Sequence, residues 1–171
     1  MNEDLSTVAP GLTNIEVITG FSEDGETPIL ERAMHPITLE MLLTHSSVLA
    51  YQFMNPLVAK WREKFSLLDE AGRRSVEELF NYPLGFQPGE GWMYGPGLDW
   101  AGRIFEQVTE LTLGEHIQHR TFDPLGMKDG QFFPVTREDL RTRMVDLNPD
   151  DPKGFGRAVL GGGGDMNLRT R

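Results

Sequence analysis

The segment from residue 83 to residue 97 constrains the fold of this chain more than any other. Eight of its fifteen residues are glycine or proline, and proline interrupts helices and central strands because it has no amide hydrogen to donate. The segment also contains Trp92 and Tyr94. Loops that combine turn-forming residues with aromatic side chains often shape a site. We therefore expect a long structured loop here, with regular elements on either side of it.

The part of the chain before this loop predicts one short strand and several helices. Residues 1–36 are rich in turn formers, and one run of Ile and Val within them fits a strand. A helix is predicted over residues 37–45, where leucines recur at the i, i+3, i+4 spacing of a buried face and Thr38 can cap the first turn. Residues 54–82 form a second helical region, in which Ser75 is a suitable N-cap for a short helix.

The part after the loop predicts three more helices. Apolar residues step by three and four over residues 98–111, as in an amphipathic helix with one buried face. Thr112 and Glu115 have the spacing of a capping box, so a further helix is expected to begin there and to run to about residue 120. Residues 136–143 fit a weaker helix.

Composition excludes several kinds of protein. The net charge of −10 disfavours binding to nucleic acids and to anionic membranes, and the densest positive stretch, residues 137–143, also contains two acidic residues. The absence of cysteine excludes disulfides, zinc–thiolate sites and a cysteine nucleophile. No run approaches the roughly 20 apolar residues of a membrane span. The acidic start has no apolar run, so we expect no signal peptide there. We expect a cytoplasmic protein.

Several segments together indicate a family. The sequence reads ITLEMLLTHSS at 37–47, FQPGE at 86–90, WMYGPGLDWAG at 92–102, FDPLGMKD at 122–129 and GGGG at 161–164. In this order they resemble the motifs of class C β-lactamase-like serine hydrolases, which include esterases and lovastatin-type acyltransferases. The resemblance covers about residues 12–164.

The resemblance implies an α+β fold. We expect a partial β-lactamase or transpeptidase-like fold, mostly its helical subdomain, with little of the central antiparallel sheet. The partial domain would span residues 1–164, followed by a divergent polar tail at residues 165–171.

The resemblance also implies acyl-transfer chemistry. In the family, the Ser of a Ser-x-x-Lys pair attacks a carbonyl carbon, and the Lys and a Tyr move the proton. Tyr94 matches that tyrosine, so its implied role is general base. Trp92 and Trp100 would line the pocket for a small acyl substrate, an ester, thioester or lactam. Packing in the core is an equally good interpretation of both tryptophans.

The nucleophile pair is missing from this sequence. None of the six serines is followed three positions later by lysine, the spacing that places a hydroxyl and an amine on one helical face. The family's Lys-Thr-Gly or His-x-Gly motif is also missing. Both motifs would lie outside the matched region, so the chain is interpreted as a fragment that is inactive alone.

Two positions depart from the family pattern. Val48 stands where glycine is usual, in a turn that would need a positive φ, and a β-branched residue there would be strained. Pro96 stands where the wider family has Asn or Ser.

Other candidate residues have simpler interpretations. His45 is expected to be structural, and the carboxylate of Asp99 is favourable at a helix N-terminus by itself. His116 and His119 lie three apart but have no third ligand, so a solvated face is expected. No lysine follows the glycines at 161–164, which argues against a phosphate loop. We expect neither a metal nor a cofactor.

Three functional hypotheses remain. The first is an inactive piece of a serine hydrolase or acyltransferase. The second is a non-catalytic pseudoenzyme that self-associates or pairs with a full-length relative through exposed apolar surface. The third is a truncated gene product with no selected function.

Overall fold

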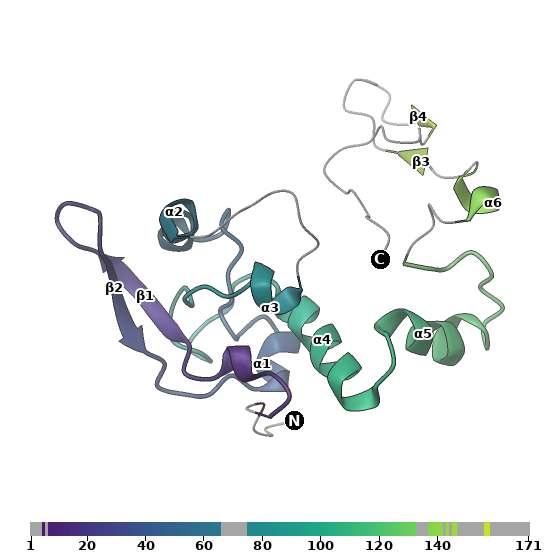
Figure 1. Ribbon diagram of the computed structural model, residues 1–171, viewed down its shortest axis with the longest axis horizontal. Coiled ribbons are helices and arrows are strands. Elements are labelled where there is room, and N and C mark those ends of the chain that lie inside the picture. Colours follow the sequence, from purple (N-terminus) through teal and green to yellow (C-terminus); the bar gives the residue numbers. More distant parts are fainter. Residues whose placement is uncertain are drawn as a thin grey trace. The chain divides into compact units, whose positions relative to one another are not determined.

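The computed structural model describes residues 5, 7–65, 75–132, 137–141, 143, 145–146 and 156–157. The chain divides into two compact units, residues 1–111 and residues 112–171 (Figure 1). The glycine run at 161–164 and the predicted tail at 165–171 lie outside the described residues.

A β-hairpin begins the first unit. Strands β1 (Glu16–Phe21) and β2 (Pro28–Arg32) pair antiparallel, with an irregularity between Ile18 and Gly20. On its other side, β1 meets the start of the long loop, since Ile18 N donates to the carbonyl of Leu84 at 2.9 Å. The predicted strand is therefore confirmed. The second strand was not predicted because it begins at a proline, which is tolerated at the start of an edge strand.

Two helices of the first unit, α1 and α3, begin where capping residues were predicted. Thr38 Oγ1 accepts from Met41 N at 3.2 Å, and Ser75 forms a full capping box with Glu78. The amphipathic helix after the loop is confirmed as α4. The bounds are η1 (Pro10–Leu12), α1 (Leu39–Leu43), α2 (Pro56–Phe65), α3 (Val76–Leu79) and α4 (Gly97–Thr109).

The core of this unit lies between α1, α4 and the loop of residues 83–97, which leads into α4 and pairs with β1. Its fully buried side chains include Leu42 of α1, Leu84 of the loop and Trp100 of α4. Helix α2 covers a smaller cluster around Ile18 and Tyr82. Burial of such side chains is the main stabilising contribution to a unit of this size.

The second unit is helical at its start. Thr112 and Glu115 form the predicted capping box at the start of α5 (Leu113–Ile117). The chain then continues as a π-helical turn, η2 (Gln118–Phe122), rather than ending near residue 120, and Asp123 N donates to the carbonyl of Gln118 at 2.8 Å. The later elements are α6 (Glu138–Arg141) and the short antiparallel pair β3 (Val145–Asp146) and β4 (Gly156–Arg157).

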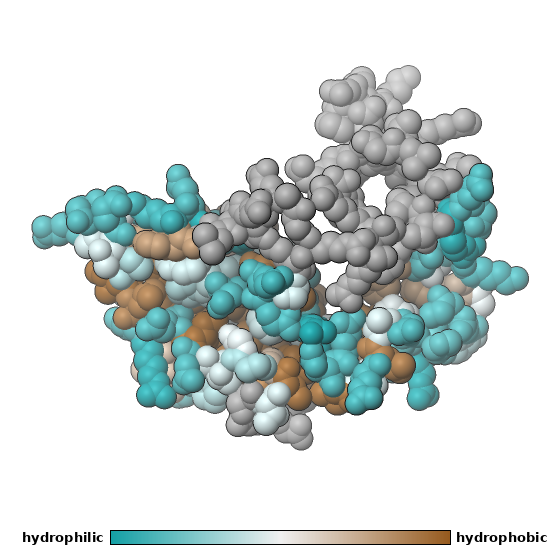
Figure 2. Space-filling model, viewed as in Figure 1, coloured by the Kyte–Doolittle hydropathy of each residue, from teal (hydrophilic) through white to brown (hydrophobic). Residues whose placement is uncertain are grey.

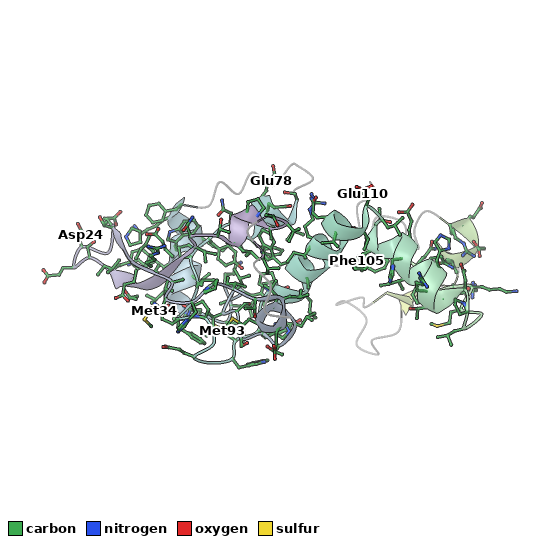
Figure 3. The ribbon with its side chains drawn as sticks, turned by 90° about the horizontal axis from the view of Figure 1, so that it is seen from below. Asp24, Met34, Glu78, Met93, Phe105 and Glu110 are labelled. Atoms are coloured by element: carbon green, nitrogen blue, oxygen red, sulfur yellow. The ribbon has the colours of Figure 1, made fainter. Side chains whose placement is uncertain are left out.

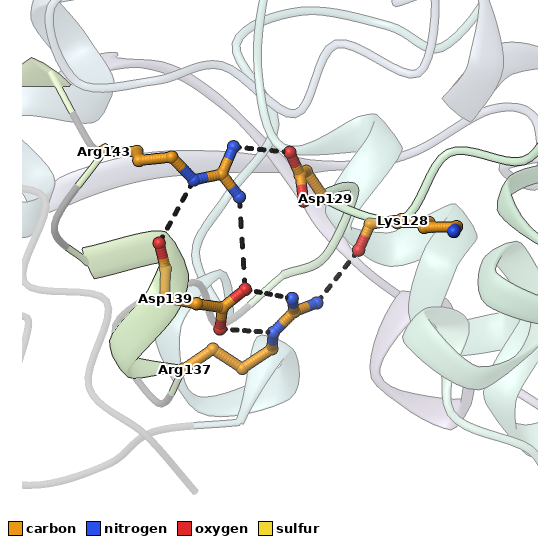
Figure 4. Close-up of polar contacts among 5 residues, drawn as sticks. All are labelled: Lys128, Asp129, Arg137, Asp139 and Arg143. Carbon is orange, nitrogen blue, oxygen red and sulfur yellow. Dashed lines mark hydrogen bonds and ion pairs between the residues drawn. The ribbon is translucent and has the colours of Figure 1, made fainter.

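An ion-pair cluster holds the start of α6 (Figure 4). Arg143 Nη1 contacts Asp129 Oδ2 at 2.7 Å, and Arg137 pairs with Asp139 and also donates to the carbonyl of Lys128 at 2.9 Å. Hydrogen bonds from Arg143 and Arg137 lower the pKa of Asp129 and Asp139, respectively. The positive charges of Arg137 and Arg143 are therefore paired. Because these groups are exposed, the pairs contribute little to stability.

The predicted fold class, α+β with little sheet, is confirmed. The described strands form only two two-stranded sheets. Within the described residues, no helix is long and apolar enough to cross a bilayer.

Candidate active site

The glycine- and proline-rich loop is held along the segment that follows α1. Met93 N donates to the carbonyl of His45 at 3.0 Å, and Tyr51 N donates to the carbonyl of Tyr94 at 3.3 Å. Figure 3 labels Met93 in this part of the first unit. Two further backbone bonds join the same segments, from Gly85 to Val48 and from Gly89 to Ser46.

Two glycines allow this close approach. A Cβ on Gly95 would stand 1.5 Å from the carbonyl oxygen of Leu49, and a Cβ on Gly97 would stand 2.3 Å from that of Leu42. No side chain fits at either distance. Glycine is therefore required at both positions for the loop backbone to cross the backbone of α1 and of the segment that follows it. The crossing fixes the backbone on either side of Tyr94.

The segment after α1 contains the strained residue that the sequence predicts. Val48 has a φ of +57° and is fully buried. A left-handed conformation costs an L-residue roughly 1–2 kcal/mol, and β-branched residues rarely adopt it. The expectation of a positive φ at Val48 is therefore confirmed.

Tyr94 lies in a cluster of aromatic side chains. Its ring is 44% exposed, and its centroid lies 5.0 Å from that of His45 and 5.4 Å from that of Tyr51. Trp92 is 62% exposed and contacts the other side of the cluster, 6.0 Å from His45. The structure thus brings together two of the three site residues named from the sequence.

Trp100 lies elsewhere. Its side chain is only 1% exposed and belongs to the main core, where a Cβ added to Gly11 would meet its ring at 3.0 Å. This placement matches the core-packing interpretation, and a role for Trp100 in lining an acyl pocket stays a prediction.

Sequence reasoning missed a polar pair beside the cluster. Tyr51 Oη donates to Asp99 Oδ2 at 3.2 Å, and burial, followed by the charge of Asp99, raises the pKa of Tyr51 to about 12. Asp99 does lie in the first turn of α4, as interpreted from the sequence. The two residues are 48 positions apart, and no local pattern links them.

The Asp99→Asn substitution is expected to lower the pKa of Tyr51. Removing the carboxylate charge favours the phenolate, while burial keeps the pKa above 10. A chain with Tyr82→Phe and Tyr94→Phe retains Tyr51 as its only tyrosine, so phenolate absorbance reports its titration directly. Asp24→Asn, which removes a carboxylate that does not act on Tyr51, should leave the titration unchanged. An unchanged midpoint in Asp99→Asn would contradict the assigned pair.

The raised pKa of Tyr51 has a defined effect on stability. The folded chain binds this proton more tightly than the unfolded chain does, whose tyrosine pKa is near 10. The contribution of protonated Tyr51 to the free energy of unfolding is therefore present below about pH 10 and is lost as the pH rises toward 12.

A pocket lies in another part of the first unit. Its volume is about 660 Å³, within the range of small-molecule sites. Neither Tyr94 nor Trp92 lines it, so it is separate from the aromatic cluster. The lining residues are Leu5, Leu12, Thr13, Asn14, Ile15, Arg32, Ala33, Met34, His35, Pro36 and Ile37.

His119 lies beside a carboxylate in the second unit. His119 is exposed, and its Nδ1 lies 3.4 Å from Asp123 Oδ2. In the part of the chain that the structure describes, no three His, Asp or Glu side chains are placed to hold an ion together.

The helices and the small antiparallel sheet define a partial β-lactamase-like fold, and comparison with known proteins gives the family. The Beta-lactamase family profile matches residues 25–168. The chain belongs to the β-lactamase family, as the motifs predicted.

Similar proteins include hydrolases and acyltransferases. The chain is 58% identical over all 171 residues to the lovastatin esterase of Penicillium rubens, covering 43% of that protein. It is 34% identical over 146 residues, 85% of this chain, to the monacolin J acid methylbutanoyltransferase of Aspergillus terreus, covering 35% of that protein. Unliganded simvastatin synthase (LovD) from Aspergillus terreus, as the selenomethionyl derivative, has a TM-score of 0.77 at 30% identity, over 91% of this chain and 39% of that one. The chain spans less than half the length of these relatives.

Proposed function

We propose that this chain supplies the tyrosine-bearing part of a serine hydrolase or acyltransferase that acts on small acyl substrates. The observation that carries this proposal is the placement of Tyr94, whose half-exposed ring lies on a loop pinned by Gly95 and by backbone hydrogen bonds. A proton-transfer group needs such a fixed, accessible position.

The proposed chemistry needs groups beyond this sequence. A serine Oγ attacks the acyl carbonyl carbon while its proton passes to Tyr94 Oη. The tetrahedral intermediate then collapses to an acyl-enzyme, and Tyr94 Oη returns the proton to the leaving group as its bond to the carbonyl carbon breaks. A free phenol has a pKa near about 10, so it needs a nearby cation to accept a proton at neutral pH. In the family pattern that cation is the lysine of Ser-x-x-Lys, which these residues lack. The proposal therefore assigns no turnover to this chain alone.

The two tryptophans have different proposed roles. Trp92 is exposed beside Tyr94 and is proposed to line the acyl pocket. Trp100, on the buried face of α4, is proposed to pack in the core that supports the site.

The proposal has a direct test by segment replacement. The matched segment of the Penicillium rubens lovastatin esterase is replaced by these 171 residues, and hydrolysis of p-nitrophenyl acetate is measured. We expect kcat/KM to stay within about tenfold of the parent enzyme, a change below 1.4 kcal/mol in transition-state stabilisation. A folded but inactive replacement would contradict the proposal.

The isolated chain provides the complementary measurement. We expect no turnover of nitrocefin or p-nitrophenyl acetate above the buffer rate, and no covalent adduct with a fluorophosphonate probe by mass spectrometry. Either signal would show that the chain contains its own nucleophile.

A second candidate function is pairing with another polypeptide of the family. Apolar residues appear among polar ones on the surface of the first unit (Figure 2), and Phe53 and Leu98 are 73% and 55% exposed. Exposed apolar side chains favour association. Size-exclusion chromatography with light scattering tests this candidate. A monomer of 19.3 kDa that binds no full-length relative would count against it.

A further inference from the structure

Helix α1 ends in a Schellman motif that places His45 in an unusual conformation. Thr44 is the C-cap, and Ser46 N donates to the carbonyl of Met41 at 2.9 Å while His45 N donates to that of Leu42 at 3.4 Å. His45 therefore occupies the position after the cap, with a φ of +58°. Glycine is the usual residue there, because a side chain is unfavourable in the left-handed region.

The backbone geometry does not require histidine. Its side chain, however, contacts the proposed site at two points, with ring centroids 5.0 Å from Tyr94 and 6.0 Å from Trp92. Between these two residues in the chain, Met93 N donates to the carbonyl of His45 at 3.0 Å. One residue thus contacts three consecutive residues of the loop.

Packing against the two aromatic rings holds the imidazole, and its buried Nδ1 contributes no hydrogen bond. Nδ1 is fully enclosed and has no hydrogen-bond partner among the described residues. A buried polar atom without a partner is unfavourable. His45 therefore combines a disfavoured backbone conformation with an unpartnered nitrogen.

We propose that His45 is a positioning residue for Tyr94. Its ring limits the orientations of the Tyr94 and Trp92 side chains, while its carbonyl fixes the backbone between them. The left-handed conformation aims the imidazole at the loop. The catalytic consequence of this inference rests on the proposed function of Tyr94, whereas the structural contact does not.

The contact is tested first in the isolated chain. The chain has only three tyrosines, so selective ¹³C labelling of tyrosine gives a simple NMR spectrum, and Tyr94→Phe assigns the Tyr94 signals. His45→Gly removes the ring and relieves the positive φ, and His45→Asn removes the ring in a residue that tolerates this conformation. We expect both variants to shift the Tyr94 ring signals while those of Tyr82, which packs in another cluster, stay in place.

Melting temperature separates positioning from general structural support. His45→Gly should melt at or above the temperature of the parent chain, because the strained conformation is relieved. A residue that served only as core packing would instead lower the melting temperature and leave the Tyr94 signals unchanged, and that pair of results would overturn the proposal.

The catalytic arm uses the segment-replaced esterase with p-nitrophenyl acetate. His45→Gly is expected to lower kcat more than about tenfold with KM within about twofold, since misplacing a reacting group by even 1 Å is costly. His45→Phe, which restores a ring, should recover most of kcat. Unchanged kcat in His45→Gly would overturn the positioning role. If the parent replacement itself is inactive, the proposed function fails, and the NMR shifts still decide whether His45 orients Tyr94.

Discussion

Replacing Tyr94 by phenylalanine in the segment-replaced esterase is expected to lower kcat by about 10²–10⁴-fold, the usual contribution of a positioned acid–base group. The ring of phenylalanine preserves the contacts with His45 and Tyr51, which involve ring faces and edges. The hydroxyl alone is lost. Steady-state hydrolysis of p-nitrophenyl acetate measures the effect, with KM expected to change little because the lost interaction belongs to proton transfer.

Tyr82→Phe is the matched control. It removes the same hydroxyl from a buried tyrosine, whose Oη donates to the carbonyl of Ala50 at 2.8 Å. Loss of that hydrogen bond should cost about 1 kcal/mol of stability and leave kcat of the folded enzyme within about twofold. Equal kcat in Tyr94→Phe and the parent enzyme would remove the tyrosine from the mechanism.

Local signals predicted much of this fold. The caps at Thr38, Ser75 and Thr112 each depend on a hydroxyl and an amide three residues apart, and all three form as expected. The amphipathic period after the loop likewise identified α4, because a helix buries one face at fixed spacing.

Features that depend on distant partners could not be predicted in the same way. Strand β2 was missed because a short edge strand beginning at Pro28 has no strong pattern of its own. The bond between Tyr51 and Asp99 joins residues whose proximity is created by the crossing of two backbones. The π-helical turn after α5 also escaped prediction, since helical period alone does not distinguish it from an α-helix.

The candidate site also contains residues that the sequence identified and a residue whose role depends on the folded structure. Tyr94 and Trp92 were named because their loop resembles that of a known family, and the structure places them together. His45 was interpreted as structural, because adjacent residues on a helix point apart and its imidazole would not reach the hydroxyls of Ser46 and Ser47. Its left-handed backbone directs the ring toward the loop instead, and no sequence pattern specified that conformation at His45.

The crossing beside Tyr94 gives the largest expected effect on stability. Gly95→Ala would place a methyl group 1.5 Å from the carbonyl oxygen of Leu49, a distance that only movement of one backbone can relieve. We expect a loss of about 3 kcal/mol or more in the free energy of unfolding, at or above the upper end for overpacking. Urea denaturation followed by circular dichroism measures this free energy of unfolding. We also expect Tyr94 to be displaced in the variant.

Gly20→Ala is the control, because it makes the same glycine-to-alanine change at a position with room for the added Cβ. This glycine lies in β1, and its added Cβ would meet only the end of the Ile29 side chain at 3.7 Å, an ordinary contact. Without a clash, alanine should change stability by less than about 1 kcal/mol, and in the stabilising direction, because it restricts the unfolded chain. If Gly95→Ala were tolerated as well as Gly20→Ala, the two backbones would not cross at contact distance. Tyr94 would then lack the rigid backbone on which the proposed chemistry depends.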